Sequence, residues 1–395
     1  MTLRLSLIVC TLALLLNACN ISVTSLPTSP GQPVEATEVP ATPYPDTPAP
    51  AAIAAPQVEA PALLDIQFFN ELDGWGLTET QIVRTNDGGI TWYNVTPADL
   101  VEVGSTVATF ILDQDHAWVQ KPDFNNFPNN GLLYHTSDGG LTWIISSTPF
   151  SGGDLSFIDV NNGWMLADLG VGAGSNAVAV FQTRDGGATW TQTYTNDPNL
   201  PDAGDSLPLS GLKSDLVPLD IQTAWVAGVI YSSGTIYLFR TDDRGRNWSP
   251  VNLEIPAGTD QFELGIDPDQ IQFVSATQGF LIVRISGDST QTAVYVTSDA
   301  GETWTLTPTL IPNAGASDFL SAEEAIIYNG EQFYVTRDAA RTWITVTPDI
   351  VFGDSFAALE FVDPNTGWII ILDPKNHRSL YRTNDGGVTW SPVIP

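Results

Sequence analysis

Short apolar runs recur along most of the chain, separated by turns rich in Gly, Asp, Asn and Thr. In the first clear group the runs are Leu64–Phe69, Trp75–Thr78, Gln81–Thr85 and Trp92–Val95. Runs this short, bounded by turn residues, are typical of β-strands rather than of helices. The pattern therefore predicts groups of four short antiparallel strands, with a tight turn between the third and the fourth.

The turn between the third and fourth runs carries a motif that occurs seven times. It first reads TNDGGITW, from Thr85 to Trp92, and the final tryptophans of successive copies lie 39 to 58 residues apart. A second motif, F-x-D-x-x-x-G-W or a relative of it, precedes each copy, and all 12 tryptophans belong to one motif or the other. Repeated large aromatic residues are usually core. The motif residues expected to be structural are Asp87, Asp138, Asp185, Asp243, Asp299, Asp338 and Asp385, with Trp92, Trp143, Trp190, Trp248, Trp304, Trp343 and Trp390.

Seven four-stranded antiparallel units at this spacing indicate one all-β domain, a seven-bladed β-propeller over residues 63–395. The sequence leaves two ways of closing the ring. Either the last blade is complete by itself, or residues before Leu63 add an edge strand.

The chemistry of the seven-fold motif suits a turn. Asp87 is placed to accept hydrogen bonds from backbone N–H groups a few residues on, and Gly88 and Gly89 permit a positive φ. One copy has Ala340 where the others have Gly, so that turn is expected to be strained or rebuilt. The pattern S/T-x-D-x-G-x-T-W resembles the Asp-box, or bacterial neuraminidase repeat. The resemblance implies a scaffold element at the periphery of the propeller, away from any ligand site.

The N-terminus is predicted to be a targeting signal followed by a disordered tether. Residues 1–18 have a short basic start and an apolar run too short to span a bilayer, as in a signal peptide. The sequence LNAC that ends at Cys19 resembles the bacterial lipobox, which implies cleavage before Cys19 and its acylation; an ordinary signal peptide with an incidental cysteine is the alternative. Residues 19–62 are rich in Pro, Thr and Ala and are expected to form a disordered tether. The expected location is extracytoplasmic, with the protein anchored by its N-terminal lipid in a membrane of a bacterial cell envelope.

Composition removes several classes of function. With 14 Lys and Arg against 45 Asp and Glu, the formal net charge is −31, which argues against nucleic acid as a partner. Both cysteines lie in the first 20 residues, so the folded part has no disulfide and no thiolate metal site. The three histidines are scattered along the chain. We expect no metal and no cofactor.

Long connections between strands are the expected place for binding. Insertions fall at residues 120–131, 167–177, 193–215 and 252–270, on the face opposite the repeated turns. Four aromatic residues in these insertions have no role in the repeat and are candidate binding residues or local packing: Phe124, Phe127, Tyr194 and Phe262.

Catalytic signals are weak, and no catalytic residue is predicted. Acid pairs such as Asp267 and Asp269 are inevitable among 45 acids, although a glycosidase dyad needs only two carboxyls about 5–10 Å apart. A sialidase would need three convergent arginines, whereas only Arg284 and Arg378 lie away from the repeated turns.

Paired motifs such as FIDVNNGWM with TRDGGATW, behind a lipoprotein signal, resemble the photosystem II assembly and stability factors of cyanobacteria and plastids. That resemblance implies a non-enzymatic, membrane-tethered scaffold that binds a membrane protein or envelope complex. No arginine patch like the one attributed to those factors is present, so no individual binding residue is carried over. Two alternatives stay open: a carbohydrate-binding or glycoside-hydrolysing surface protein of sialidase or xyloglucanase type, which makes a glycan a second candidate partner, and a purely structural surface protein.

Overall fold

The computed structural model describes residues 53–313, 315–373, 375 and 377–394. Cys19, the predicted signal peptide 1–18 and most of the predicted tether lie outside this range. The described residues belong to a unit that begins at Pro50. No helix among them is long and apolar enough to cross a membrane.

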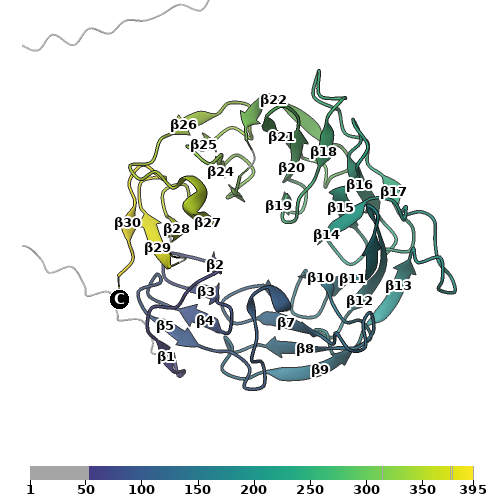
Figure 1. Ribbon diagram of the computed structural model, residues 1–395, viewed down its shortest axis with the longest axis horizontal. Helices are drawn as coiled ribbons and strands as arrows, with labels where there is room; N and C mark the ends of the chain where they lie inside the picture. Colours follow the sequence, from purple (N-terminus) through teal and green to yellow (C-terminus); the bar gives the residue numbers. More distant parts are fainter. Residues whose placement is uncertain (1–52, 314, 374, 376, 395) are drawn as a thin grey trace, which may run out of the picture. The chain divides into compact units, whose positions relative to one another are not determined.

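Seven antiparallel blades stand around a ring, as the repeats predict (Figure 1). We number these blades 1 to 7 in chain order, and in each the first strand lies nearest the centre. Blade 1 consists of β2 (Asp65–Phe68), β3 (Gly74–Leu77), β4 (Ile82–Thr85) and β5 (Trp92–Asn94). Blade 2 consists of β6 (Ala108–Ile111), β7 (Ala117–Pro122), β8 (Gly131–Thr136) and β9 (Ile144–Thr148). Blade 3 consists of β10 (Gly153–Phe157), β11 (Gly163–Gly172), β12 (Ser175–Thr183) and β13 (Thr191–Thr195).

The remaining blades follow the same order. Blade 4 consists of β14 (Leu212–Pro218), β15 (Ala224–Val229), β16 (Tyr237–Thr241) and β17 (Ser249–Pro250), and blade 5 of β19 (Ile271–Phe273), β20 (Gly279–Ser286), β21 (Thr290–Thr297) and β22 (Thr305–Pro312). Blade 6 consists of β23 (Ser317–Phe319), β24 (Ala325–Tyr328), β25 (Phe333–Thr336) and β26 (Ile344–Val346), and blade 7 of β27 (Phe356–Phe361), β28 (Gly367–Leu372), β29 (Arg378–Thr383) and β30 (Ser391–Pro392). A short extra strand, β18 (Glu263–Gly265), pairs with both β15 and β20 and so joins blades 4 and 5 into one sheet.

The first strand of the chain settles how the ring closes. Blade 7 is complete by itself, whereas β1 (Gln57–Val58) adds a fifth strand to the outer edge of blade 1 by pairing with β5. The two residues of β1 fall inside the predicted tether, so the folded part starts earlier than Leu63. Between blades 1 and 7 the ring is closed by side-chain packing of β2 against β27.

The repeated turns are built by the same three hydrogen bonds in every blade. In blade 1 the Gly89 N–H donates to Thr85 Oγ1 (3.0 Å), the Thr85 hydroxyl donates to Asp87 Oδ1 (2.9 Å), and the Thr91 N–H donates to the same oxygen (2.8 Å). The equivalent contacts recur at Asp138, Asp185, Asp243, Asp299, Asp338 and Asp385. The aspartates are therefore committed to the backbone of their own turns.

The tryptophans that follow these turns are core residues. Four are buried and three are half-buried: Trp92, Trp248, Trp304 and Trp390, then Trp143, Trp190 and Trp343. The turns also lie on the same face of the ring as the turns between the first and second strands, because the Gly88 N–H donates to Leu72 O (2.9 Å), and equivalent bonds form in the other six blades. Binding functions on the opposite face are thus structurally independent of the motif.

Ala340 shows that the motif tolerates alanine without rebuilding. Its backbone has φ 60°, and its N–H donates to Thr336 Oγ1 at 3.0 Å, as glycine does in the other turns. The expected strain is present as a left-handed alanine, but the expected rebuilding is absent from this turn.

Gly301 is a turn glycine at which alanine is expected to fail. It has φ 68°, and a Cβ there would lie 2.4 Å from Cζ2 of the buried Trp225 ring. We expect Gly301→Ala to lower the free energy of unfolding by about 2–3 kcal/mol, because a rigid ring must move and the backbone is strained. Urea unfolding measures the change. Ala340→Gly is the control, with an expected change within about 1 kcal/mol, and equal stability of Gly301→Ala and the unaltered protein would refute this account.

Candidate functional site

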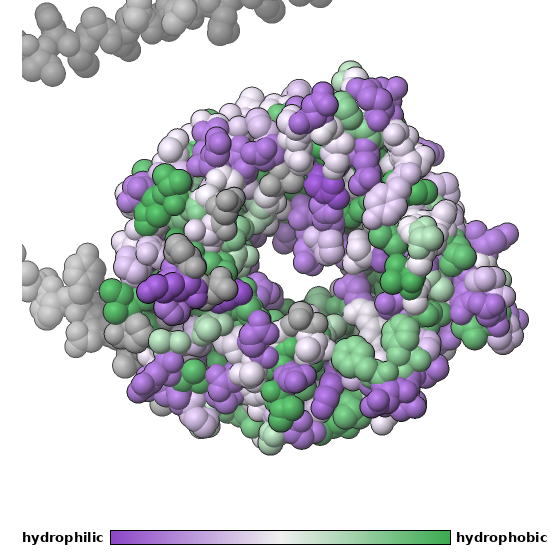
Figure 2. All heavy atoms as spheres, viewed as in Figure 1, coloured by the Kyte–Doolittle hydropathy of each residue, from purple (hydrophilic) through white to green (hydrophobic). Residues whose placement is uncertain are grey.

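Along the innermost strands, side chains alternate between two directions, so that apolar and polar residues point toward different neighbouring blades. Phenylalanines at the ends of inner strands pack against the preceding blade: the Phe157 ring stacks on Trp118 of blade 2 (3.8 Å between ring centroids), and Phe68 stacks on Trp368 of blade 7 (3.9 Å). Residues one or three positions before these phenylalanines therefore point toward the following blade. Several of them are acids, carried by β2, β10, β23 and β27, the inner strands of their blades. Figure 2 shows the opening at the centre of the ring.

These acids bridge neighbouring blades. Asp154 Oδ2 on β10 accepts the Leu216 N–H of blade 4 (2.6 Å), and Asp318 Oδ2 on β23 accepts the Phe361 N–H of blade 7 (2.5 Å). These bonds satisfy backbone N–H groups on the inner strand of the following blade. The carboxyls are thus fixed in position and largely enclosed by protein.

One group of acids on blades 3 to 5 is strongly perturbed. Burial raises the pKa of Asp154 to about 7, and burial together with the charges of Asp154 and Asp269 raises the pKa of Asp215 well above its ordinary value. Asp215 is 5% exposed, and its Oδ2 has no hydrogen-bond partner. A buried carboxylate oxygen without a partner is costly, so the pair favours a state that retains a proton at neutral pH.

Asp154 reaches a polar pocket at the seam between blades 3 and 4. The pocket has a volume of about 320 Å³, and β10, β11, β12 and β14 form its walls. It is lined by Gly153, Asp154, Leu166, Asp168, Asn176, Val178, Lys213 and Ser214. Asp154 is the second residue of β10, and Asp168 lies on the half of β11 that leads into its hairpin with β12, on the face opposite the repeated turns. The pocket therefore occupies the face where the sequence placed binding.

The two carboxyls of the pocket stand at diagonal positions on paired strands. Asp154 is the register partner of Leu166, and Asp168 lies two residues further along β11. Diagonal neighbours in an antiparallel pair are about 7–8 Å apart at the backbone, which leaves room between the side chains for a bond of a bound substrate. Asp168 Oδ1 accepts the Gly170 N–H (2.9 Å) and is held in place by its own chain.

Lys213 and Asn176 join the two sides of the pocket. The Lys213 Nζ donates to the carbonyl oxygens of Asn176 (3.0 Å), Leu209 (2.8 Å) and Gly211 (3.1 Å), and burial lowers its pKa to about 8. The Asn176 amide exchanges hydrogen bonds with the Lys213 backbone (3.1 and 3.0 Å). This clamp holds the β11–β12 hairpin against β14, so that the pocket has a defined shape.

The arrangement suits acid–base chemistry rather than metal chemistry. Among the described residues, no group of three or more His, Cys, Asp or Glu is placed to hold a metal ion. The two arginines outside the repeated turns have structural contacts: Arg284 pairs with Asp267 (2.7 Å), and Arg378 Nη1 donates to Leu63 O (3.1 Å). They do not line this pocket.

The four aromatic residues predicted for binding divide into two pairs. Phe124 and Phe127 are exposed, at 73% and 45% of their surface. Tyr194 is buried in β13, where its hydroxyl accepts the Leu207 N–H (2.8 Å), and Phe262 packs against the core between blades 4 and 5. Tyr194 follows the local-packing alternative, because the insertion after β13 folds back over it and uses it as local core.

The sequence prediction missed Asp154, Asp168 and Asp215, although one signal was present. Asp65, Asp154 and Asp215 each lie three residues before the F or P that opens the second motif of their blade. An acid at a repeated position on an inner strand, where hydrophobic residues would serve packing, marks a functional candidate.

A scan against models of protein families finds no match. Two curated relatives are similar to this chain: a xyloglucanase of Hypocrea jecorina, 27% identical over 288 residues, and a xyloglucanase of a Paenibacillus species, 23% identical over 312 residues. These alignments cover 67% and 73% of this chain but only 29% and 26% of the relatives, so the chain spans less than a third of their length.

Solved structures share the fold at low identity. The GH74 enzyme of Niastella koreensis matches with a TM-score of 0.56 at 12% identity, covering 86% of this chain and 55% of that chain. The protein YCF48 bound to a D1 peptide matches with a TM-score of 0.50 at 17% identity, covering 86% and 99%. At these identities the likeness establishes the β-propeller and leaves the particular family undetermined.

The curated relatives correct the functional expectation. A non-enzymatic scaffold of the photosystem II assembly type was expected, but both relatives are xyloglucanases, and GH74 xyloglucanases are among the structural neighbours. These findings favour the glycoside hydrolase alternative, and they also overturn the expectation that the chain is not an enzyme.

Proposed function

We propose that this protein is a glycoside hydrolase that acts on a neutral polysaccharide, with Asp154 as its general acid. The observation that carries the proposal is the placement of two carboxyls in one polar pocket, Asp154 and Asp168, with burial raising the pKa of Asp154 to about 7, so that it keeps its proton below that pH. Glycoside hydrolysis uses two carboxyls, one of which donates a proton to the leaving oxygen. The similarity to xyloglucanases over two thirds of the chain supports the same chemistry.

Each carboxyl has a defined role in the proposed reaction. Asp154 donates its proton to the glycosidic oxygen as the bond between that oxygen and the anomeric carbon breaks. Asp168 either removes a proton from the attacking water or attacks the anomeric carbon itself, and water supplies the hydroxyl of the new reducing end. Asp215 is buried and does not line the pocket, so it touches no substrate; it is a positioning residue whose charge is coupled to that of Asp154.

The charge of the chain limits the substrate. A net charge of −31 and an acidic pocket repel polyanions, so we infer a neutral glycan such as xyloglucan. The predicted acylation of Cys19 and its tether would present the propeller to polysaccharide outside the cytoplasm.

The direct test is to incubate the full chain with xyloglucan, mixed-linkage β-glucan and polygalacturonate and to measure new reducing ends. We expect cleavage of a neutral glucan and none of polygalacturonate. Binding of the glucans without release of reducing ends would refute the hydrolase and leave a binding protein.

A further inference from the structure

The loop between β7 and β8 presents an exposed aromatic side chain in a rigid setting. Phe124 is 73% exposed, yet its loop is closed by local hydrogen bonds. The Asp123 carboxylate accepts the Asn125 N–H (3.0 Å) and the Asn126 side-chain amide (2.7 Å), and the Asn129 N–H donates to Asn126 O (2.8 Å). The same loop also exposes Phe127, at 45% of its surface, so it presents two large apolar rings, and apolar surface gathered in one place indicates binding.

This loop is tied to the segment that leads into the pocket. The Ser151 N–H donates to Pro128 O (2.8 Å), the Ser151 hydroxyl donates to Asp123 O (3.1 Å), and the Gln120 amide donates to Ser151 O. Ser151 lies three residues before Asp154. The position of Phe124 is therefore fixed relative to the proposed general acid.

The surroundings of Phe124 combine an apolar ring with hydrogen-bonding groups. A surface hollow of about 610 Å³ beside it is lined by Asp123, Asn125, Asn130, Ser147 and the Lys121 side chain, among others. An aromatic face packs against the C–H face of a sugar ring, while amides and carboxylates bond its hydroxyls. Neutral sugars fit this mixture, whereas the acidity of the chain disfavours anionic ones.

We propose that Phe124 forms a remote subsite that binds a sugar residue of the same glycan chain whose glycosidic bond lies at Asp154. This inference rests on the proposed function. The hollow lies on blade 2 and the pocket at the seam between blades 3 and 4, and blades 2 and 3 are neighbours through β6 and β10. The occupant is therefore an oligosaccharide of several residues rather than a single sugar.

Binding is tested apart from catalysis in the full chain carrying Asp154→Asn, with xyloglucan oligosaccharides as the probe. Phe124→Ala in that background is expected to weaken binding by about five- to tenfold in calorimetry, the effect of losing one aromatic contact. The matched control is Ile144→Ala, which removes a 66% exposed side chain on the outer strand of the same blade and lines neither cavity. Unchanged affinity in Phe124→Ala, or an equal loss in Ile144→Ala, overturns the subsite.

Kinetics with active protein separate the two proposals. If Phe124→Ala raises KM and leaves kcat unchanged, both the subsite and the hydrolase stand. If KM is unchanged while cleavage continues, the subsite fails alone. If oligosaccharides bind through Phe124 but no variant cleaves them, the hydrolase fails and the subsite stands.

Discussion

Asp154→Asn is expected to lower kcat for glucan cleavage by a factor of about 10²–10⁴, the usual contribution of a general acid. Asparagine has the same shape and still accepts the Leu216 N–H, which lies 2.6 Å from Asp154 Oδ2, but it has no acidic proton to give to the leaving oxygen. The substrate should still bind, so KM is expected to change much less than kcat. Reducing-end assays on xyloglucan give both constants.

Asp318→Asn is the matched control for this loss. Asp318 is also an inner-strand acid, its pKa is also raised to about 7 by burial, and it also accepts an N–H from the next blade. It lies in blade 6 and does not line the pocket. Its replacement should leave kcat unchanged, and an equal loss of activity in both variants would show that these acids only hold blades together.

The pH dependence of the reaction follows from the same group. Because burial raises the pKa of Asp154 to about 7, the proton is present below that pH and is lost above it. The value of kcat should therefore fall as the pH rises through about 7, and Asp154→Asn should lack this alkaline limb. An alkaline limb that survives in Asp154→Asn would assign the acid to another residue.

The fold could be predicted from the sequence because the contacts that form its repeated turns lie within short stretches of the chain. The threonine, aspartate and glycine of each repeated turn bond within five consecutive residues, so the whole turn is written in a short motif such as TNDGG. Seven copies of a local motif then determine the number of blades. The sequence did not determine how the ring closes, because the pairing of β1 with β5 joins residues that are distant in sequence.

The pocket could not be predicted from the sequence, because its residues are distant from one another along the chain. Asp154 and Asp168 are 14 residues apart in sequence and meet only through the register of β10 with β11, while Lys213 arrives from the next blade. Among 45 acids, a pair defined by register has no local signature. The sequence likewise left open whether Tyr194 binds a partner or packs locally, because its burial depends on Leu207, 13 residues later in an irregular connection.

The seam between blades 1 and 7 should be the most sensitive place in the ring. Among the described residues no strand pairs across it, so side chains alone join the two ends of the domain. Trp368 is the centre of this contact: it is fully buried, its ring lies 3.9 Å from Phe68 at an interplanar angle of 4°, and its Nε1–H donates to Gly88 O (3.1 Å). Beside it, Arg382 pairs with Glu71 (2.9 Å).

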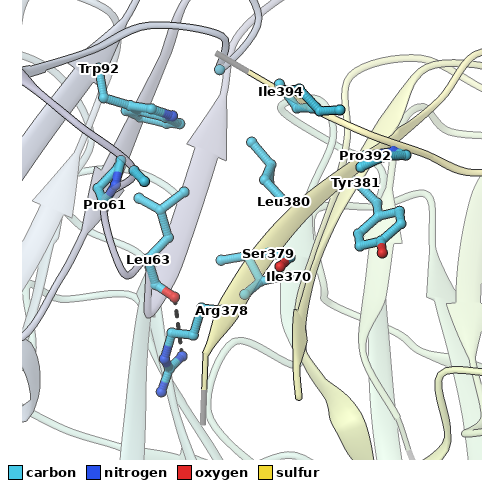
Figure 3. Close-up of a pocket in the computed structure, with 13 residues that line it drawn as sticks. Pro61, Leu63, Trp92, Ile370, Arg378, Ser379, Leu380, Tyr381, Pro392 and Ile394 are labelled. Atoms are coloured by element: carbon cyan, nitrogen blue, oxygen red, sulfur yellow. Dashed lines mark hydrogen bonds between the residues drawn. The ribbon is translucent and has the colours of Figure 1, made fainter. Parts of the chain in front are cut away.

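Packing at this seam is incomplete toward the outside. A pocket of about 260 Å³ lies there, with Leu63 and Trp92 of blade 1 facing Ile370 and Leu380 of blade 7, and the Arg378 side chain bonded to Leu63 O at its inner end (Figure 3). Trp368 itself does not line this pocket, but it packs in the same core cluster as Leu63, Ile370 and Leu380, which do. The outer part of the seam cannot compensate for damage to its inner part.

Trp368→Ala is accordingly expected to lower the free energy of unfolding by about 3–5 kcal/mol, the usual cost of removing a buried tryptophan, and to open the ring at this one seam. Trp164→Ala is the matched control, since Trp164 has the same place in blade 3, is equally buried and donates to Asp220 O of the next blade (3.2 Å). Both variants should lose stability in urea. Only Trp368→Ala should increase amide hydrogen exchange selectively in β2 and β27, because blades 3 and 4 stay joined by the continuous chain. Equal and uniform exchange in the two variants would mean that the ring unfolds as one unit and that its closing seam has no special weakness.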